Sequence, residues 1–241
     1  MSARDRLIVA LDVPNFEEAR SLVDKLADHV GAFKVGKELF VAEGPDVVRL
    51  IHERGGRVFL DLKFHDIPNT VAHAVGAAAT MGVWMLDVHA SGGPAMLRAA
   101  VETTEKVSLA TGREQSLVIG VTVLTSLDDD DLDAVGLAGP TSAAATRLAK
   151  LARTAGLNGV VASAREAAAL KTACGDEFLI VTPGIRPASA TTDDQKRVMT
   201  PADAIAAGSD YLVVGRPITR SPMPAAAAEM IVEEIAAALA D

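Results

Sequence analysis

Short apolar runs alternate with longer amphipathic segments along the whole chain. Residues 7–12 form an apolar run that ends in an acid, and residues 15–30 follow with apolar positions at helical spacing. The same alternation recurs eight times. It predicts strands over 7–12, 32–36, 58–63, 84–90, 116–126, 159–164, 178–185 and 211–218. It predicts helices over 15–30, 44–53, 71–81, 93–109, 141–155, 166–172, 201–207 and 224–239.

This order of elements predicts the fold class. Strands that alternate with helices indicate parallel strands joined by crossover helices, and eight such units in 241 residues match an α/β fold of the (β/α)8 TIM-barrel type. We expect residues 1–241 to form a single domain. A doubly wound open sheet is the second choice, weakened because no GxGxxG turn follows the first predicted strand.

Two predicted connections are longer than a barrel requires, residues 127–140 and 186–200. Both follow strands on the face where barrels keep their active sites, so they are candidate lids. The first contains the acid run 128–131, which we expect to be a solvated loop with acids near a helix start.

The stretch 58–66 concentrates charge next to an apolar run. If residues 58–63 are a strand, Asp61 and Lys63 point to one face and Leu60 and Leu62 to the other. Asp66 lies just past the strand end. Buried charges are costly unless they are paired. Taken alone, the local pattern leaves open whether this row is a structural ion network or a reaction centre.

Other polar residues fall at the ends of predicted strands, which share one mouth of a barrel. They are Asp12, Lys34, Thr125, Arg186 and Arg216. Arg216 follows Gly215 after the eighth strand, where barrels often bind phosphate, and an arginine can contact two phosphate oxygens. Gln195, in the long connection 186–200, lies where it can close over the same phosphate. The sequence therefore predicts a phosphorylated small-molecule ligand.

Composition excludes several other classes. A net charge of −9 and only 3% aromatic residues argue against nucleic-acid binding. Glutamates interrupt the alanine-rich segment 225–240, so no membrane span is expected. The N-terminus does not resemble a signal peptide, and we expect a cytoplasmic protein. The single cysteine, Cys174, excludes a disulfide framework and indicates an ordinary thiol.

Metal binding has weak support. His65 and His89 belong to no HxH or HExxH pattern, and we interpret both as packing or hydrogen-bonded histidines. No motif indicates a cofactor. We therefore predict neither a metal nor a cofactor.

The segment Asp61-Leu-Lys-Phe-His-Asp66-Ile-Pro-Asn-Thr70 resembles the DxKxxDIPNT signature of the orotidine 5′-phosphate decarboxylase family, bacterial type. The resemblance extends over essentially the whole chain. It is supported by residues 11–12, 34–37, 88–93, 121–126, 182–187, 195 and 214–217. It implies a cofactor-free homodimeric enzyme that decarboxylates orotidine 5′-phosphate to uridine 5′-phosphate in pyrimidine biosynthesis.

The resemblance also implies roles for individual residues. Lys63 matches the proton donor, and Asp61 the carboxylate beside the departing CO2. Lys34 and Asp66 match the rest of a charge network in which Asp66 comes from the other subunit. Asp12, Lys34 and Thr70 match positions that bind the ribose, and Thr70 also comes from the neighbouring subunit. Thr125 belongs to the segment that matches the pyrimidine and lid contacts, and Arg186 is a binding position in the loop after the seventh strand. Gln195, Gly215 and Arg216 match the phosphate site.

Two alternatives stay open. One is a magnesium-dependent sugar-phosphate decarboxylase or aldolase-type lyase of the same barrel suprafamily, in which a bare DxKxxD pattern also occurs. The segments 182–187 and 66–70, together with Gln195, count against it. The other is a non-catalytic sensor of a phosphorylated ligand, which the intact charged row disfavours.

Overall fold

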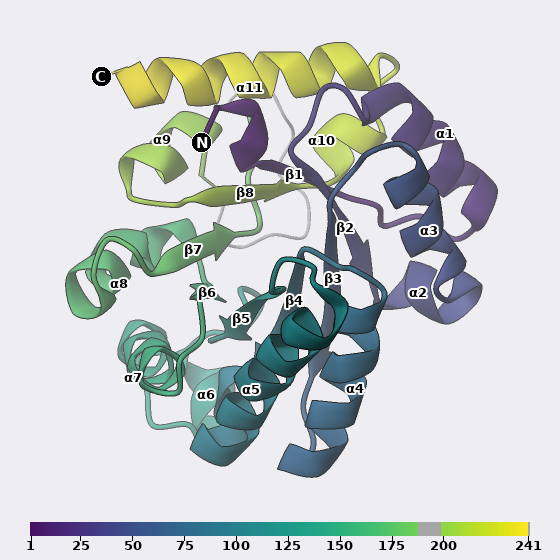
Figure 1. Cartoon of the computed structure of the whole chain (residues 1–241). Helices are drawn as coiled ribbons and strands as arrows, with labels where there is room; N and C mark the ends of the chain where they lie inside the picture. The colour runs from purple at the N-terminus through teal and green to yellow at the C-terminus, as the bar shows by residue number, and fades with distance from the viewer. Residues whose placement is uncertain (188–198, 241) are drawn as a thin grey trace.

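A computed structural model of the chain describes residues 1–187 and 199–240. Eight parallel strands close into a barrel in the order β1 to β8, and helices surround the barrel (Figure 1). Closure is direct, since β8 pairs with β1 through Ile8 and Val213. The predicted (β/α)8 barrel is confirmed.

The strands are short. They are β1 (Leu7–Ala10), β2 (Ala32–Gly36), β3 (Val58–Phe64), β4 (Met85–His89), β5 (Leu117–Val121), β6 (Gly159–Val161), β7 (Leu179–Thr182) and β8 (Tyr211–Val214). The predictions over 116–126 and 211–218 are too long. Gly215 caps a short helix, α10 (Arg216–Thr219), with Pro217 in its first turn. Proline has no N–H for a sheet but suits a helix start, so the chain turns at Gly215.

The helices on the outside follow the predicted order with three additions. They are α1 (Phe16–Leu26), α2 (Lys37–Glu43), α3 (Asp46–Glu53), α4 (Pro68–Thr80), α5 (Gly93–Thr111), α6 (Asp129–Ala134), α7 (Thr141–Thr154), α8 (Ala167–Cys174), α9 (Pro201–Ala206), α10 and α11 (Pro224–Ala240). The unexpected α2 starts directly at the end of β2. Single 3-10 turns lie at Arg4–Arg6, Ala90–Gly92 and Ala164–Glu166.

The second unexpected helix, α6, lies within the long connection 127–140. The side chain of Asp128 accepts a hydrogen bond from the backbone N–H of Asp131, and Asp131 in turn accepts one from the N–H of Asp128. This reciprocal capping satisfies two N–H groups that a helix start leaves unpaired. The acid run 128–131 thus lies at a helix start, as expected, but it forms the cap and first turn of α6 instead of an irregular loop.

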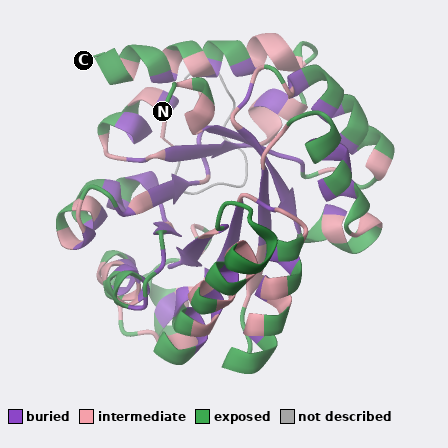
Figure 2. Ribbon diagram, viewed as in Figure 1, coloured by how far each residue is buried: buried purple, intermediate pink, exposed green. Residues whose placement is uncertain are grey.

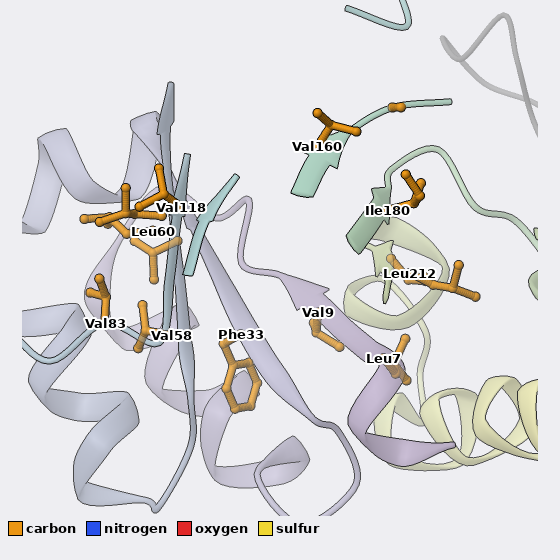
Figure 3. Packing of buried hydrophobic residues seen from close by; sticks show 14 of the residues in the cluster. Leu7, Val9, Phe33, Val58, Leu60, Val83, Val118, Val160, Ile180 and Leu212 are labelled. Atoms are coloured by element: carbon orange, nitrogen blue, oxygen red, sulfur yellow. The ribbon is translucent and has the colours of Figure 1, made fainter. Parts of the chain in front are cut away.

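Side chains alternate between two apolar layers. One layer fills the barrel with residues such as Ile8, Phe59 and Met85. The other lies between the strands and the helices and includes Leu60, which Figure 3 shows among its neighbours. The strands are mostly buried, although the last three residues of β3 are partly exposed, whereas the helices are exposed on their outer faces (Figure 2). The predicted alternation of residues 60–63 therefore holds for Leu60, which points away from the barrel axis.

Two further expectations concern Cys174 and membrane-spanning helices. Cys174 is a free, buried thiol at the end of α8, and burial raises its pKa. Among the described residues, no helix has the length and apolar character that crossing a bilayer requires.

The barrel leaves no room for a side chain at Gly159 in β6. A Cβ atom there lies 2.2 Å from the backbone oxygen of Leu179 in β7. We expect Gly159→Ala to lower the free energy of unfolding by about 3 kcal/mol, because backbone must move to relieve the overlap. Urea denaturation measures the change. Gly139→Ala is the control, since its Cβ meets only a carboxylate oxygen of Asp133 at 3.9 Å; equal losses in both variants contradict the prediction.

Candidate active site

Strands β2 and β3 place the charged residues Lys34, Asp61 and Lys63 at the C-terminal mouth of the barrel. In the register of β2 and β3, Lys34 lies beside Phe59 and Gly36 beside Asp61. Phe59 points into the barrel, so Asp61, two residues further, points the same way. Gly36 makes the space for this, because a Cβ atom there lies 3.2 Å from Nζ of Lys34.

The ammonium groups and carboxylates alternate. Nζ of Lys34 lies 3.2 Å from Oδ1 of Asp12 and 3.2 Å from Oδ2 of Asp61. Nζ of Lys63 forms a very short ion pair with Oδ1 of Asp61. The carboxylate of Asp61 thus binds one lysine with each oxygen. The prediction that Asp61 and Lys63 share a face is confirmed.

Burial and charge compete in this row. Only 9% of Lys34 and 9% of Asp61 is exposed. Burial by itself raises the pKa of Asp61, but attraction to Lys34, a hydrogen bond with Asp87 and attraction to Lys63 outweigh it and lower the pKa below its ordinary value. Burial also lowers the pKa of Lys34, yet Asp61 and Asp12 raise it overall. Both groups therefore remain charged at neutral pH.

Asp87 in β4 is a member of the cluster that the sequence did not identify. Its side chain is fully buried. Oδ1 accepts a 2.7 Å hydrogen bond from the backbone N–H of Lys63, and Oδ2 lies 4.0 Å from Nζ of Lys63. Within the predicted strand 84–90 nothing local distinguishes Asp87, and only the closed barrel brings it to Lys63.

Two adjoining cavities open at this mouth and share Lys34 and Asp61. The first, about 290 Å³, has a largely apolar wall and is lined by Lys34, Phe59, Asp61, Lys63, Val121, Val123, Leu124, Thr125, Ser126, Val161, Ala162, Pro183 and Val213. The second, about 450 Å³, is polar and is lined by Ala10, Asp12, Lys34, Asp61, Pro183, Gly184, Arg186, Val213, Gly215, Arg216 and Arg220. The site therefore combines an apolar end with a cationic end.

The structure brings most of the predicted residues together. Eight of them line these cavities, namely Asp12, Lys34, Asp61, Lys63, Thr125, Arg186, Gly215 and Arg216. Asp66 and Thr70 line neither cavity; Asp66 is exposed and its carboxylate accepts a hydrogen bond from the N–H of Ile67. Gln195 lies outside the described residues.

Arg220, a cationic residue, is another member of the site that the sequence did not identify. It lines the polar cavity together with Arg216, four residues earlier. A strand over 211–218 does not bring Arg216 and Arg220 together. A helical turn that starts at Gly215 does so, because residues four positions apart share a helix face.

The two histidines flanking the row lie close to each other. The ring centroids of His65 and His89 are 5.3 Å apart, and burial followed by repulsion from His65 lowers the pKa of His89. In residues 1–187 and 199–240, no three or more His, Cys, Asp or Glu side chains gather as a metal site would require.

We expect Lys34→Met to raise the pKa of Asp61, because the strongest attraction that opposes the cost of its burial is lost. The 13C shift of the Asp61 carboxyl carbon, followed by NMR against pH, measures the change. Arg54→Met removes a cation that pairs with Asp24 and Glu53 instead, and should leave this titration in place. An unchanged Asp61 midpoint in Lys34→Met contradicts the assignment of Lys34 as its main counter-ion.

The amino-acid sequence matches a family model described as orotidine 5′-phosphate decarboxylase / HUMPS family over residues 5–231. The chain is 55% identical over 236 residues to an orotidine 5′-phosphate decarboxylase of Moorella thermoacetica, covering 98% of this chain and 94% of the relative. It is 56% identical over 235 residues to that of Alkalilimnicola ehrlichii, with 98% of each chain covered.

Solved structures agree with the sequence matches. The crystal structure of orotidine 5′-phosphate decarboxylase from Lactobacillus acidophilus superimposes with a TM-score of 0.85 at 40% identity, covering 95% of this chain and 98% of that chain. An uncharacterized conserved protein from Geobacillus kaustophilus gives 0.83 at 39% identity, covering 95% and 99%. With this fold, this charged row and these relatives, the chain belongs to the orotidine 5′-phosphate decarboxylase family.

Proposed function

We propose that this chain is a carbon–carbon lyase that converts orotidine 5′-phosphate to uridine 5′-phosphate and CO2 in pyrimidine biosynthesis, without a cofactor. The observation that carries this proposal is the ammonium group of Lys63 against Asp61 at the floor of the apolar cavity, with Arg216 across the adjoining polar cavity. The relatives at 55% and 56% identity bear the name of this decarboxylase.

The two cavities fit the two ends of such a substrate. The phosphate binds in the polar cavity, where Arg216 follows the half-buried Gly215 at the start of α10. Arg186 lines this cavity as well, and we assign Gln195, which lies outside the described residues, to binding of the same phosphate. The pyrimidine ring lies in the apolar cavity beside Thr125. Between them, the ribose hydroxyls meet Asp12 and Lys34, which pair with each other across the shared wall.

The chemistry follows from the placement of Lys63. When the bond between C6 and the carboxylate breaks, its electron pair stays on C6 and CO2 leaves. A fixed ammonium group next to C6 stabilises the charge that develops there. Lys63 then donates a proton from Nζ to C6, which gives uridine 5′-phosphate and a neutral amine that solvent protonates again.

Asp61 acts on the other side of the breaking bond. Both of its oxygens already bind lysines, so its negative charge is fixed in position next to the substrate carboxylate. Repulsion between the two carboxylates ends when CO2 departs, and this favours the forward step. Lys34 keeps Asp61 ionised and oriented, as the lowered pKa of Asp61 requires.

The enzyme works as a homodimer in which Asp66 and Thr70 complete the partner's site. In a single chain both residues lie away from the cavities, and Ile67 beside Asp66 is 66% exposed. Residues 65–70 are all exposed in the single chain, so Asp66 and Thr70 are free to meet a second subunit. No nucleic acid or membrane takes part, and the enzyme is cytoplasmic.

Decarboxylation is tested directly by the loss of orotidine 5′-phosphate absorbance. Wild-type protein should turn over this substrate at the same rate with and without a chelator, whereas Lys63→Ala should lose at least about a thousandfold in kcat, because both the stabilising charge and the proton donor are lost. Lys106→Ala, an exposed lysine on α5, is the matched control. Loss of wild-type activity in the chelator favours the magnesium-dependent alternative, and an active Lys63→Ala removes Lys63 from the mechanism.

The shared site predicts complementation between two inactive chains. Asp66→Ala supplies an intact Lys63, and Lys63→Ala supplies an intact Asp66. After mixing under conditions that exchange subunits, half of the dimers are hybrids with one complete site, so about a quarter of wild-type activity should return. Mixing Lys63→Ala with Lys63→Arg is the control and should restore nothing. If the first mixture also stays inactive although hybrids form, each site lies within one chain.

A further inference from the structure

A buried carboxyl group remains that the proposed mechanism does not use. Asp87 is fully buried in the middle of β4 and lies next to Lys63 of β3. Its neighbour in β5 is Ile119, an apolar residue of the barrel interior. A buried carboxyl group on this apolar side requires partners, and those partners are Lys63 and Asp61.

The backbone of Lys63 is in an unusual conformation. Lys63 has a φ of 51°, which makes it the single non-glycine residue with positive φ in the part of the chain described here. The register between β3 and β4 shifts between Leu60 and Phe64, so residues 61–63 leave the regular ladder. Oδ1 of Asp87 accepts the N–H of Lys63 that the ladder no longer pairs, at 2.7 Å. The side chain thus takes the place of a strand carbonyl.

The second oxygen of Asp87 points toward the same cluster. Oδ2 is completely buried, lies 4.0 Å from Nζ of Lys63, and has no hydrogen-bond donor among the described residues. Its carboxyl group also contacts that of Asp61. Two ionised carboxylates have only acceptors, so this contact is a hydrogen bond only when one of them carries a proton.

We propose that Asp87 is a positioning residue for Lys63, which holds the β3 bulge through Oδ1 and, as a neutral acid protonated at Oδ2, donates a hydrogen bond to Asp61. It thereby fixes both members of the reacting ion pair without touching the substrate. The inference rests on the proposed function for its kinetic consequence, but the placement of the Lys63 backbone does not depend on that function.

The surroundings decide which carboxyl group carries the proton. Burial, then repulsion from Asp61, raises the pKa of Asp87 well above its ordinary value, and Lys63 only partly opposes this. Asp61 has two lysines of its own, which keep it ionised. The ionisable groups that act on Asp87 are these β3 residues, since β5 presents Ile119 and Val121 beside β4. One proton shared by the pair is then held on Asp87.

Asparagine copies the neutral acid, because its Oδ1 accepts the Lys63 N–H and its amide donates to Asp61. We therefore expect Asp87→Asn to keep kcat within about threefold of wild type, and Asp87→Ala to lower kcat about 100-fold with little change in KM, since a misplaced reacting group mainly affects turnover. The Lys63 amide should exchange slowly with solvent in wild type and Asp87→Asn, and rapidly in Asp87→Ala. Ser116→Ala controls for a general loss of stability. It removes a buried 2.6 Å hydrogen bond that the Ser116 hydroxyl, just before β5, donates to the backbone oxygen of Val83.

Stability against pH gives a readout that needs no substrate. The folded chain keeps the Asp87 proton at a pH where the unfolded chain releases it, so the contribution of Asp87 to wild-type stability falls as pH rises above about 4. Asp87→Asn does not titrate, and its stability relative to wild type should grow with pH over that range. This comparison also decides the matter if Asp87→Ala does not fold.

Three results overturn the proposal: an Asp87→Asn variant whose kcat falls about 100-fold, an Asp87→Ala variant with wild-type kcat, or a stability difference between Asp87→Asn and wild type that does not vary with pH. If wild type itself fails to consume orotidine 5′-phosphate, the proposed function fails, whereas amide exchange and pH-dependent stability still test the placement of Lys63 by Asp87.

Discussion

The ion pair between Lys63 and the buried Asp61, at the mouth of the barrel, is the interaction on which the rest of the site depends. Charges taken out of water are stable only with close counter-charges, and a buried carboxylate that loses its partner is strongly destabilising. Lys34 meets this requirement by lying 3.2 Å from both Asp12 and Asp61. The row is therefore a chain of mutually dependent charges, in which each lysine holds a carboxylate that holds the next lysine.

The backbone is shaped around this requirement. A regular β3 ladder pairs the N–H of Lys63 with β4, but the register shifts there and Lys63 takes a left-handed conformation. Such conformations persist only where neighbouring groups stabilise them. The Asp87 hydrogen bond and the ion pair with Asp61 supply that stabilisation. Gly36 contributes by leaving space that a larger residue would take from the Lys34 ammonium group.

Sequence reasoning reached the barrel and the alternating row because both depend on local periodicity. Period two places Asp61 and Lys63 on one face, and eight repeated units imply the closed sheet. The same periodicity does not predict features that depend on tertiary contacts. The apolar segment after Val214 reads as strand until Gly215 and Pro217 turn it into α10, which places Arg220 in the polar cavity. Asp87 reads as an ordinary strand residue, since its partner lies 24 positions earlier in the chain.

The division of the site into two cavities explains how a distant group influences the reacting bond. Lys34 and Asp61 line both cavities, so a ligand that fills the polar one packs directly against the groups that orient Lys63. In the proposed function, a ligand held by Gly215 and Arg216 displaces water from the wall that Lys34 and Asp61 form between the two cavities. Removing water strengthens each charge interaction in the row. The proposed function therefore lets binding at the cationic end strengthen the ion pair of Lys63 without any contact between Arg216 and the pyrimidine ring.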